Sequence, residues 1–576
     1  MPEKTVSQPA AERLSLAASL CHQPQQLRFG TSGRRGLVVD LTQLEIYINA
    51  RAELEYLQTI PLSEGGIVRG DEFYFAYDLR PSSTRFDPES QGRGEIAQAI
   101  ECAIRDAGMR PVNLGYLPTP ALSYYAIRRN KGSMMVTGSH IPFDRNGYKS
   151  NTSRGELLKH HEEPIAAMVN AIREEICSQP LEHSLFNQQG MLKSGHRELP
   201  PVLDGARQSY VERYVSFWPD APLRGLRLLF YQHSAVGRDL VPEILERLGA
   251  EVIRTGHCED FVPIDTENID EAQISAIESL TAKAPHGAID AVISTDGDSD
   301  RPLVLTVDPV TARLRFQSGD LLGILVAEYL HADAVVVPIT CNDAIDRGNL
   351  APVLEPKTRV GSPHVIAGME IAKSQGKKVV CGWEANGGFL LGSDVTRDGR
   401  LLRALATRDA VLPVVAVLAC AQEKNVSLPA LFSRLPRRFN RTALMKNFPR
   451  ATGTRIVRSF QPAEPTQVAA FERDKIAPNG LKIPTPDATS PGNLHDRLSV
   501  HFSPQRGFSA ISQLNFVDGL RVTFCNGEVT HLRPSGNADE FRVYAFADSA
   551  ERADEITAIC LQEPNGILRE MERAVS

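Results

Sequence analysis

Short apolar runs alternate with longer stretches of helical periodicity over most of this chain. Residues 73–77 are apolar and aromatic, and residues 94–106 follow them with helical periodicity after a polar turn. The same order recurs at 226–231 and 240–248, and residues 334–338 form another apolar run. Alternation of this kind is typical of parallel α/β units, so the pattern predicts three α/β regions.

The chain after residue 438 has a different pattern. Asn526-Gly527 is a turn signal between two apolar runs, and this combination is typical of a hairpin. The pattern predicts, in order, strands at 520–525, 529–532 and 541–546 and a helix at 550–561. Prolines and turn residues between 461 and 504 indicate a loop or an insertion. We interpret the region as an α+β module.

The length agrees with this division, because 576 residues at roughly 150 per domain give about four domains. Residues 1–26 have neither the apolar segment of a signal peptide nor the arginine-rich, acid-poor composition of a transit peptide. We predict an N-terminal extension at 1–27, α/β domains at 28–205, 206–305 and 306–437, and an α+β domain at 438–576.

Composition and charge exclude several classes of protein. A formal net charge of −7 disfavours a dedicated nucleic-acid binder, because such proteins neutralise phosphates with Lys and Arg. The longest apolar stretch, 410–421, is shorter than the roughly 18–20 residues of a membrane span and predicts a buried helix. Nine scattered cysteines without a CxxC pair indicate reduced thiols. We therefore expect a cytoplasmic protein without nucleic-acid or membrane partners.

The first candidate for chemistry is the segment Thr137 to Lys149. It follows an apolar strand at 134–136, and Pro142 and its other turn residues exclude a helix. Ser139 therefore lies on a loop at the carboxyl end of a strand, where α/β proteins bind ligands. It could be a nucleophile or phosphoryl acceptor, with Lys149 as a cation or an acid/base. The alternative is an ordinary serine in a turn.

The second candidate is the acidic segment after the apolar run 288–293. In extended backbone, Asp296, Asp298 and Asp300 would project to one face and repel one another. A hard cation with oxygen ligands removes this repulsion, and Mg²⁺ suits a few carboxylates together with a phosphate oxygen. An EF-hand is excluded, because Arg301 stands where that loop needs glycine. The alternative is a solvated acidic loop.

The third candidate is the glycine-rich segment 382–389. Glu384 and Asn386 can exchange hydrogen bonds with hydroxyl groups, and the glycines permit close approach of the backbone. This composition suits sugar hydroxyls, with a turn that binds nothing as the alternative.

The fourth candidate is the segment 533–542. Arg533, Arg542 and Ser535 flank a glycine turn and could hold a phosphate through guanidinium groups and backbone N–H groups. The alternative is a surface turn with solvated arginines. Neither a GxxxxGK[ST] nor a GxGxxG motif is present, so P-loop and dinucleotide chemistry have no support.

Taken in order, these four segments resemble the α-D-phosphohexomutase family, most closely a bacterial phosphomannomutase branch. The resemblance covers roughly residues 28–576 and includes the loop 29–36 and the segment 117–120. It implies three related mixed α/β domains and a C-terminal α+β domain around a central cleft.

The resemblance also implies a role for each candidate residue. Ser139 matches the phosphoserine, and Asp296, Asp298 and Asp300 match the Mg²⁺ ligands, to which the phosphoserine adds an oxygen. Arg301 matches the arginine that closes the metal loop, Lys149 a lysine beside the transferring phosphoryl group, and Arg35 an arginine that contacts phosphate. Glu384 and Asn386 match the residues that bind the sugar hydroxyls. The residues that match the binding site for the distal phosphate are Arg533, Ser535, Gly536, Asn537 and Arg542.

Some positions depart from the family pattern. Ile141 replaces the usual asparagine after the phosphoserine, Asn386 replaces a serine, and Asn537 replaces a threonine. Ser362 stands where some members have a histidine in the third domain. The general acid or base of the third domain is therefore not assigned.

The implied activity is the interconversion of hexose 1-phosphate and hexose 6-phosphate through a hexose 1,6-bisphosphate. Mannose phosphate is the expected substrate and glucose phosphate the second. We expect one Mg²⁺ per active site, the bisphosphate as activator, a small-molecule sugar phosphate as partner, and a monomer or homodimer. Two alternatives stay open: a Mg²⁺-dependent sugar phosphatase, in which water intercepts the phosphoserine, and a catalytically degenerate regulator that binds sugar phosphates.

Overall fold

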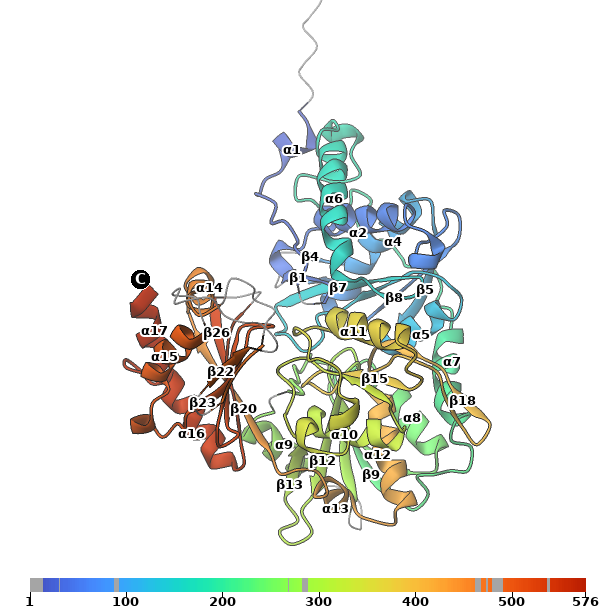
Figure 1. Cartoon of the computed structure of the whole chain (residues 1–576). Helices are drawn as coiled ribbons and strands as arrows, with labels where there is room; N and C mark the ends of the chain where they lie inside the picture. The colour runs from blue at the N-terminus through green and yellow to red at the C-terminus, as the bar shows by residue number, and fades with distance from the viewer. Residues whose placement is uncertain are drawn as a thin grey trace, which may run out of the picture.

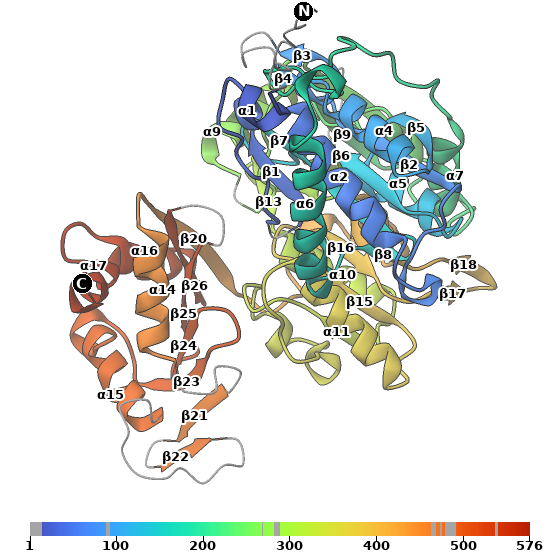
Figure 2. The ribbon, with the colours of Figure 1, turned by 90° about the horizontal axis from the view of Figure 1, so that it is seen from above.

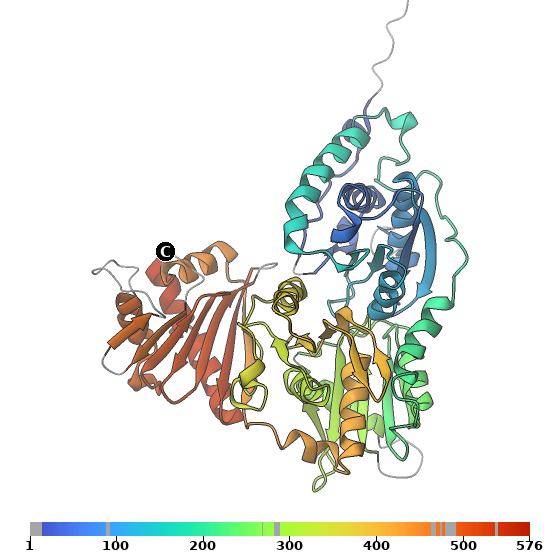
Figure 3. The same ribbon diagram turned by 45° about the vertical axis from the view of Figure 1, so that its right-hand side comes forward.

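Three α/β domains follow one another along the chain in the computed structural model, and a fourth domain of different construction lies at their side (Figures 1 and 3). The structure describes residues 14–30, 32–87, 93–267, 269–281, 289–461, 468–472, 475–478, 491–535 and 539–575. This order agrees with the predicted fold class.

The first domain is built on a six-stranded mixed sheet in the order β1-β7-β6-β2-β5, with β8 on β7. Its strands are β1 (Arg34–Leu37), β2 (Glu72–Tyr77), β5 (Arg110–Tyr116), β6 (Ser133–Val136), β7 (Arg145–Thr152) and β8 (Gly155–Glu156). The main helices are α2 (Gln43–Leu57), α4 (Ile96–Asp106), α5 (Thr119–Ile127) and α6 (Glu162–Cys177), with short α1 (Leu16–Ser19) and α3 (Pro81–Thr84) and a small ladder of β3 (Phe86–Asp87) with β4 (Arg93–Gly94).

The second domain has a five-stranded sheet in the order β10-β9-β11-β12-β13. Its elements are β9 (Arg227–His233), β10 (Glu251–His257), β11 (Ala291–Thr295), β12 (Pro302–Val307), β13 (Leu314–Gln317), α7 (Gly205–Val215), α8 (Leu240–Arg247) and α9 (Glu271–Thr281). The first three strands of this sheet are parallel, and β12 and β13 are antiparallel. The parallel units that the alternation predicts are therefore extended by antiparallel strands, which the sequence pattern did not predict.

The third domain has a four-stranded sheet in the order β14-β15-β16-β19. Its elements are β14 (Ala334–Val336), β15 (Val380–Trp383), β16 (Phe389–Leu391), β19 (Leu405–Asp409), the ladder β17 (Val395–Arg397) with β18 (Arg400–Leu402), and helices α10 (Gly319–Tyr329), α11 (Ser362–Ser374), α12 (Val411–Glu423) and α13 (Leu428–Phe432). Residues 411–421 of α12 are all buried, so the predicted buried helix is confirmed. Among the described residues, no helix is long and apolar enough to cross a membrane.

The fourth domain is a seven-stranded antiparallel sheet in the order β20-β26-β25-β24-β23-β21-β22. Its elements are β20 (Phe439–Lys446), β21 (Val468–Glu472), β22 (Lys475–Pro478), β23 (Ile511–Asn515), β24 (Leu520–Phe524), β25 (Val529–Pro534), β26 (Glu540–Ala547) and helices α14 (Arg450–Ser459), α15 (Pro491–His501), α16 (Ala550–Leu561) and α17 (Ile567–Val575). Figure 2 shows the helices on the face of the sheet that points away from the other domains. The predicted hairpin and helix are confirmed, and the proline-rich region contains β21, β22 and α15.

Two kinds of contact connect the domains. One continuous apolar core includes Tyr125, Phe230 and Trp383, which come from the first, second and third domains, whereas the fourth domain has a separate core. The fourth domain is joined to the third mainly by polar contacts. Arg438 donates to both carboxylate oxygens of Asp343 at 2.7 Å. The first three domains can therefore be treated as one packed body that carries the fourth.

Candidate active site

Ser139 lies in the loop between β6 and β7, and its side chain is buried. Its Oγ donates a hydrogen bond to Oδ2 of Asp296 at 2.7 Å, across the boundary between the first two domains. Its φ angle is +55°, a left-handed conformation that costs a non-glycine residue roughly 1–2 kcal/mol. Strained residues of this kind cluster at functional sites, where the surrounding structure fixes them.

The strained loop is held by Arg80, which sequence analysis did not identify. The buried guanidinium group lies against the ring of Phe261, 3.7 Å from its centroid. It donates to four carbonyl oxygens of the loop, those of Ser139, Ile141, Pro142 and Arg145, at 2.6–3.0 Å. A single arginine therefore ties both ends of the loop together and sets the position of the Ser139 side chain.

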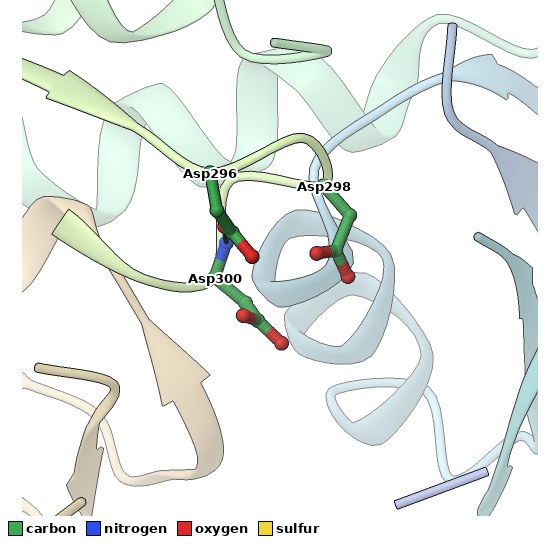
Figure 4. Close-up of side chains that lie close together, drawn as sticks. All are labelled: Asp296, Asp298 and Asp300. Atoms are coloured by element: carbon green, nitrogen blue, oxygen red, sulfur yellow. Dashed lines mark hydrogen bonds between the residues drawn. The ribbon is translucent and has the colours of Figure 1, made fainter. Parts of the chain in front are cut away.

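The acidic loop connects β11 to β12 and brings its three carboxylates together. One oxygen atom from each carboxylate lies within 4.8 Å of the other two, and Figure 4 shows the three side chains converging. The predicted convergence is confirmed, but the extended backbone that we expected is not observed. The loop is a tight turn closed by a hydrogen bond from Asp296 N to Arg301 O, with Ser299 at φ +55°. The hairpin geometry, rather than strand alternation, directs the carboxylates to one side.

The two loops touch through Gly297. A Cβ atom at this position would lie 2.6 Å from the carbonyl oxygen of Ser139, too close for any side chain. Glycine therefore permits the close approach that brings Ser139 to Asp296.

The acidic cluster fits a hard divalent cation. Lys149 Nζ donates to Oδ2 of Asp298 and Oδ2 of Asp300, both at 2.6 Å, while Oδ1 of each carboxylate is buried without a hydrogen-bond partner among the described residues. Burial and the two neighbouring carboxylates raise the pKa of Asp296 well above its ordinary value. Burial alone would raise the pKa of Asp298, but Lys149 holds it below its ordinary value. Unpaired oxygens and mutual repulsion are what an oxygen-binding cation would relieve.

Helix α5 also supports the acidic loop. At the start of this helix, Thr119 donates through Oγ1 to Oδ2 of Asp298 at 2.5 Å, and its backbone N–H donates to the Asp298 carbonyl at 3.0 Å. The segment 117–120 therefore fixes the middle carboxylate, a role that the sequence did not reveal.

Basic side chains gather near His140, the residue that follows Ser139. Arg301 NH1 lies 2.7 Å from Nδ1 of His140, and burial together with this arginine holds the pKa of His140 well below its ordinary value. His140 is therefore a neutral imidazole near pH 7. Burial and the nearby Arg301 charge lower the pKa of Arg35 to about 10, so Arg35 remains charged. Gathered cations of this kind favour an anion such as phosphate.

Arg408, which sequence analysis also missed, stands at the end of β19 with 2% of its surface exposed. Its Nε donates to Oδ2 of Asp300 at 3.0 Å, and its NH1 donates to Oε2 of Glu384 at 3.0 Å. The acidic loop and the glycine-rich loop are thereby joined through one guanidinium group.

The glycine-rich loop lies between β15 and β16 and buries both Glu384 and Asn386. Oδ1 of Asn386 accepts from Gly388 N at 3.0 Å, and the Asn386 carbonyl accepts from Thr266 Oγ1 at 2.8 Å. A Cβ atom on Gly319 would lie 2.1 Å from the backbone nitrogen of Gly387, so this loop rests directly on the start of α10. Glu384 and Asn386 are thus brought beside the acidic loop.

The fourth candidate segment lies on the fourth domain. Arg533 on β25 and Arg542 on β26 are cross-strand partners, and like charges in this position repel unless an anion lies between them. Arg533 Nε contacts Oδ2 of Asp518 at 3.1 Å. Ser535 is buried and directly follows β25. Gly536 and Asn537 lie outside the described residues.

Glu267, another residue that sequence analysis missed, connects the two ends of the site electrostatically. Burial and Asp265 raise its pKa to about 7, while Arg542 and Arg301 oppose the shift. Its neighbour Thr266 bonds the Asn386 carbonyl, which places it beside the glycine-rich loop. Glu267 therefore interacts electrostatically with Arg542 of the fourth domain and with Arg301 of the acidic loop.

Comparison with known proteins gives one consistent result. Models of the phosphoglucomutase/phosphomannomutase α/β/α domains I, II and III match residues 26–176, 208–308 and 318–439. A phosphomannomutase of Sinorhizobium fredii is 35% identical over 539 residues, which are 92% of this chain and 97% of the relative. A phosphomannomutase of Salmonella muenchen is 34% identical over 543 residues, with 93% and 95% covered.

Solved structures agree on the fold. A phosphoglucomutase/phosphomannomutase family protein of Burkholderia thailandensis superposes with a TM-score of 0.60 at 18% identity, over 95% of this chain and 97% of the other. A putative phosphomannomutase of Thermus thermophilus gives a TM-score of 0.61 at 17% identity, over 92% and 98%. The uncovered share of this chain is smaller than the fourth domain, so both likenesses extend into that domain.

Proposed function

Because the chain belongs to the phosphoglucomutase/phosphomannomutase family, and is therefore an intramolecular phosphotransferase, we propose that it interconverts mannose 1-phosphate and mannose 6-phosphate. Glucose phosphates are the second proposed substrates. The two relatives at 34–35% identity, both named phosphomannomutases, favour mannose.

The observation that carries the proposal is the position of Ser139. Its hydroxyl lies on a strained, buried loop, 2.7 Å from a carboxylate of the acidic cluster, and the next residue, His140, is within reach of the positive charges of Arg301 and Arg35. In the proposed cycle, phosphorylated Ser139 gives its phosphoryl group to the free sugar hydroxyl. The bond between phosphorus and Ser139 Oγ breaks as a bond to the sugar oxygen forms; the sugar hydroxyl loses its proton and Ser139 Oγ takes one up. The bisphosphate then turns over before the other phosphoryl group returns to Ser139.

A divalent cation completes the proposed site. We propose one Mg²⁺ per active site, held by Asp296, Asp298 and Asp300 together with an oxygen of the phosphoserine. When bound, it would offset negative charge on the transferring phosphoryl group. Lys149, which contacts two of the three carboxylates, is proposed to lie against the same group. A hexose 1,6-bisphosphate is the proposed activator, because it would restore a dephosphorylated Ser139.

Two further sets of residues are proposed to hold the substrate. The first is Glu384 and Asn386 on the sugar hydroxyls. The second binds the phosphate that does not react and consists of Arg533, Ser535, Gly536, Asn537 and Arg542. This distal site must hold a phosphate for either orientation of the sugar, and paired arginines can do so without reading which carbon carries it.

A coupled assay tests the proposal. Mannose, glucose and glucosamine 1-phosphates would each be supplied with Mg²⁺ and a trace of the matching bisphosphate, and the 6-phosphate and free phosphate would be measured together. We expect formation of mannose 6-phosphate at the highest kcat/KM and little free phosphate. Free phosphate as the main product would point to a sugar phosphatase, and tight binding without turnover would point to a regulator. Either result would refute the proposed function.

A further inference from the structure

Arg408 connects loops of all three α/β domains. Beyond its bonds to Asp300 and Glu384, its NH1 lies 3.4 Å from Oγ of Ser362 and its NH2 lies 3.4 Å from Oγ of Ser32. Ser32 belongs to the first domain, Asp300 to the second, and Ser362 and Glu384 to the third. The planar guanidinium group can span these partners because it carries donors on three nitrogen atoms in a fixed geometry.

The charges around Arg408 explain why a cation stands here. Glu384 is only 5% exposed, and a buried carboxylate without a partner is costly. Glu156 lies close by, bonded to Ser362 Oγ at 2.6 Å and to Thr407 Oγ1 at 2.7 Å. Arg408 is therefore the cation that offsets the negative charges of Glu384 and Glu156.

Arg408 does not duplicate Lys149. Both cations contact Oδ2 of Asp300, but Lys149 reaches across to Asp298, whereas Arg408 reaches across to Glu384. Lys149 thus bridges two carboxylates of the acidic loop. Arg408 instead links that loop to Glu384, one of the residues proposed to hold the sugar. The backbone on which it stands is well supported, since α5 packs on β19 and the adjacent Asp409 accepts from Tyr210 at 2.6 Å.

We propose that Arg408 is a positioning residue for the proposed mutase reaction. It holds the Glu384 carboxylate, which contacts the sugar hydroxyls, at a fixed place relative to Asp300 of the acidic loop. The accepting hydroxyl is thereby kept in line with the phosphoryl group on Ser139. The inference rests on the proposed function, and it assigns to Arg408 a role that acts through Glu384 rather than through direct contact with the substrate.

A double-mutant cycle between Arg408→Ala and Glu384→Gln tests this role. If Arg408 acts through Glu384, each single variant should lower kcat/KM for mannose 1-phosphate on the order of 100-fold, as expected for loss of alignment. The double variant should then lose little more than the worse single variant. Additive losses would contradict the inference, because they would mean that the two residues act independently.

Rescue experiments separate positioning from general damage. Added guanidinium or methylguanidinium should restore part of kcat to Arg408→Ala and nothing to the double variant. Arg408→Lys should remain impaired, since one ammonium group cannot span Asp300 and Glu384. The matched control is Arg93→Ala, which removes another buried arginine, one that bonds the backbone carbonyls of Val39 and Gln189 in the first domain. We expect it to lower the melting temperature without a specific loss of kcat, and an equal loss of kcat would contradict our inference.

Two further measurements keep the test decisive. If Arg408→Ala does not fold, the cycle is measured with Arg408→Lys. Calorimetric affinity of each variant for mannose 1-phosphate should show the same coupling as kcat/KM. If the wild-type protein binds mannose 1-phosphate without turning it over, the proposed mutase function fails while the coupling can still be measured. If turnover is normal and the coupling is absent, only the inference about Arg408 fails.

Discussion

The side chains around Ser139 are fixed by contacts between three domains, whereas Arg533 and Arg542 stand on a fourth domain with a core of its own. At the first site, Ser139, Lys149 and the three aspartates are all buried and hydrogen-bonded across domain boundaries. At the second, the two arginines are half-buried, and each faces a carboxylate of the chain itself, Asp518 or Glu267.

The two sites differ in how much their geometry depends on motion of the fourth domain relative to the first three. The apolar core that unites the first three domains holds Ser139 and the acidic cluster in one arrangement. The distal site depends on where the fourth domain lies, and that domain is joined to the third by polar contacts such as Arg438 with Asp343 and Arg521 with the Ile339 carbonyl. Polar interfaces of this kind permit relative domain motion. We infer that binding of the distal phosphate is the step in which the two ends are brought together.

The largest effect is expected at Ser139, in the site that the first three domains hold in place. Ser139→Ala should lower mutase turnover about 10⁴-fold or more, because it removes the group proposed to carry the phosphoryl. Steady-state kinetics with mannose 1-phosphate measure this loss. Ser133→Ala, a buried serine on the preceding strand, is the control and should keep turnover within a few fold. Near-normal turnover in Ser139→Ala would remove the basis of our account.

The next effect concerns the cation. Exhaustive chelation should abolish turnover and added Mg²⁺ should restore it, since buried carboxylates otherwise repel the substrate phosphate. Asp298→Asn should weaken Mg²⁺ binding in titration calorimetry by at least about 10-fold through loss of one charged ligand. The control is Asp290→Asn, at an exposed position just before β11, the strand that leads into the acidic loop. This variant should bind Mg²⁺ normally. Full activity in the chelated protein would exclude a metal at this site.

A smaller effect is expected at the distal end. Arg533→Ala should raise the free energy of the transition state by about 2–4 kcal/mol, the range found when one partner of a buried charge pair is truncated. Turnover and affinity should both fall, and by similar factors in the two directions of the reaction. Arg441→Ala, on β20 and paired with Asp554, is the control and should change neither. Impairment in one direction only would mean that this site does not serve both orientations.

The smallest effect is a pH dependence at Glu267. Its folded pKa of about 7 lies above the ordinary value, so the folded protein binds this proton more tightly than the unfolded chain. The associated stability is present at low pH and is lost as pH rises toward 7. Above pH 7 the ionised carboxylate should also compete with substrate phosphate for Arg542. Glu267→Gln should therefore flatten the fall in melting temperature between about pH 5 and 7, and unchanged slopes would contradict this assignment.

How much of the site could be predicted depends on whether the signal is local. The three aspartates after an apolar run form a pattern within five residues, so their convergence could be predicted, although the turn that produces it could not. Arg80, Thr119, Glu267 and Arg408 are single polar residues without a local pattern, and only tertiary packing brings them to Ser139. In the fourth domain the hairpin at 520–532, the strand at 541–546 and the helix at 550–561 were predicted, because the Asn526-Gly527 turn and the apolar periodicity lie close together in sequence. The strands β20 to β23 and the helices α14, α15 and α17 were not predicted.

The central claim is that Ser139 carries the exchanging phosphoryl group, and one measurement tests it directly. One sample of the protein incubated with ³²P-labelled mannose 1,6-bisphosphate would be digested and its labelled peptide identified by mass spectrometry. A second sample would be chased with unlabelled mannose 1-phosphate before it is digested. Our account predicts label on the peptide that contains Ser139 and its transfer to the sugar bisphosphate within one turnover. Sustained turnover with no label on that peptide, or with label on another residue, would contradict it.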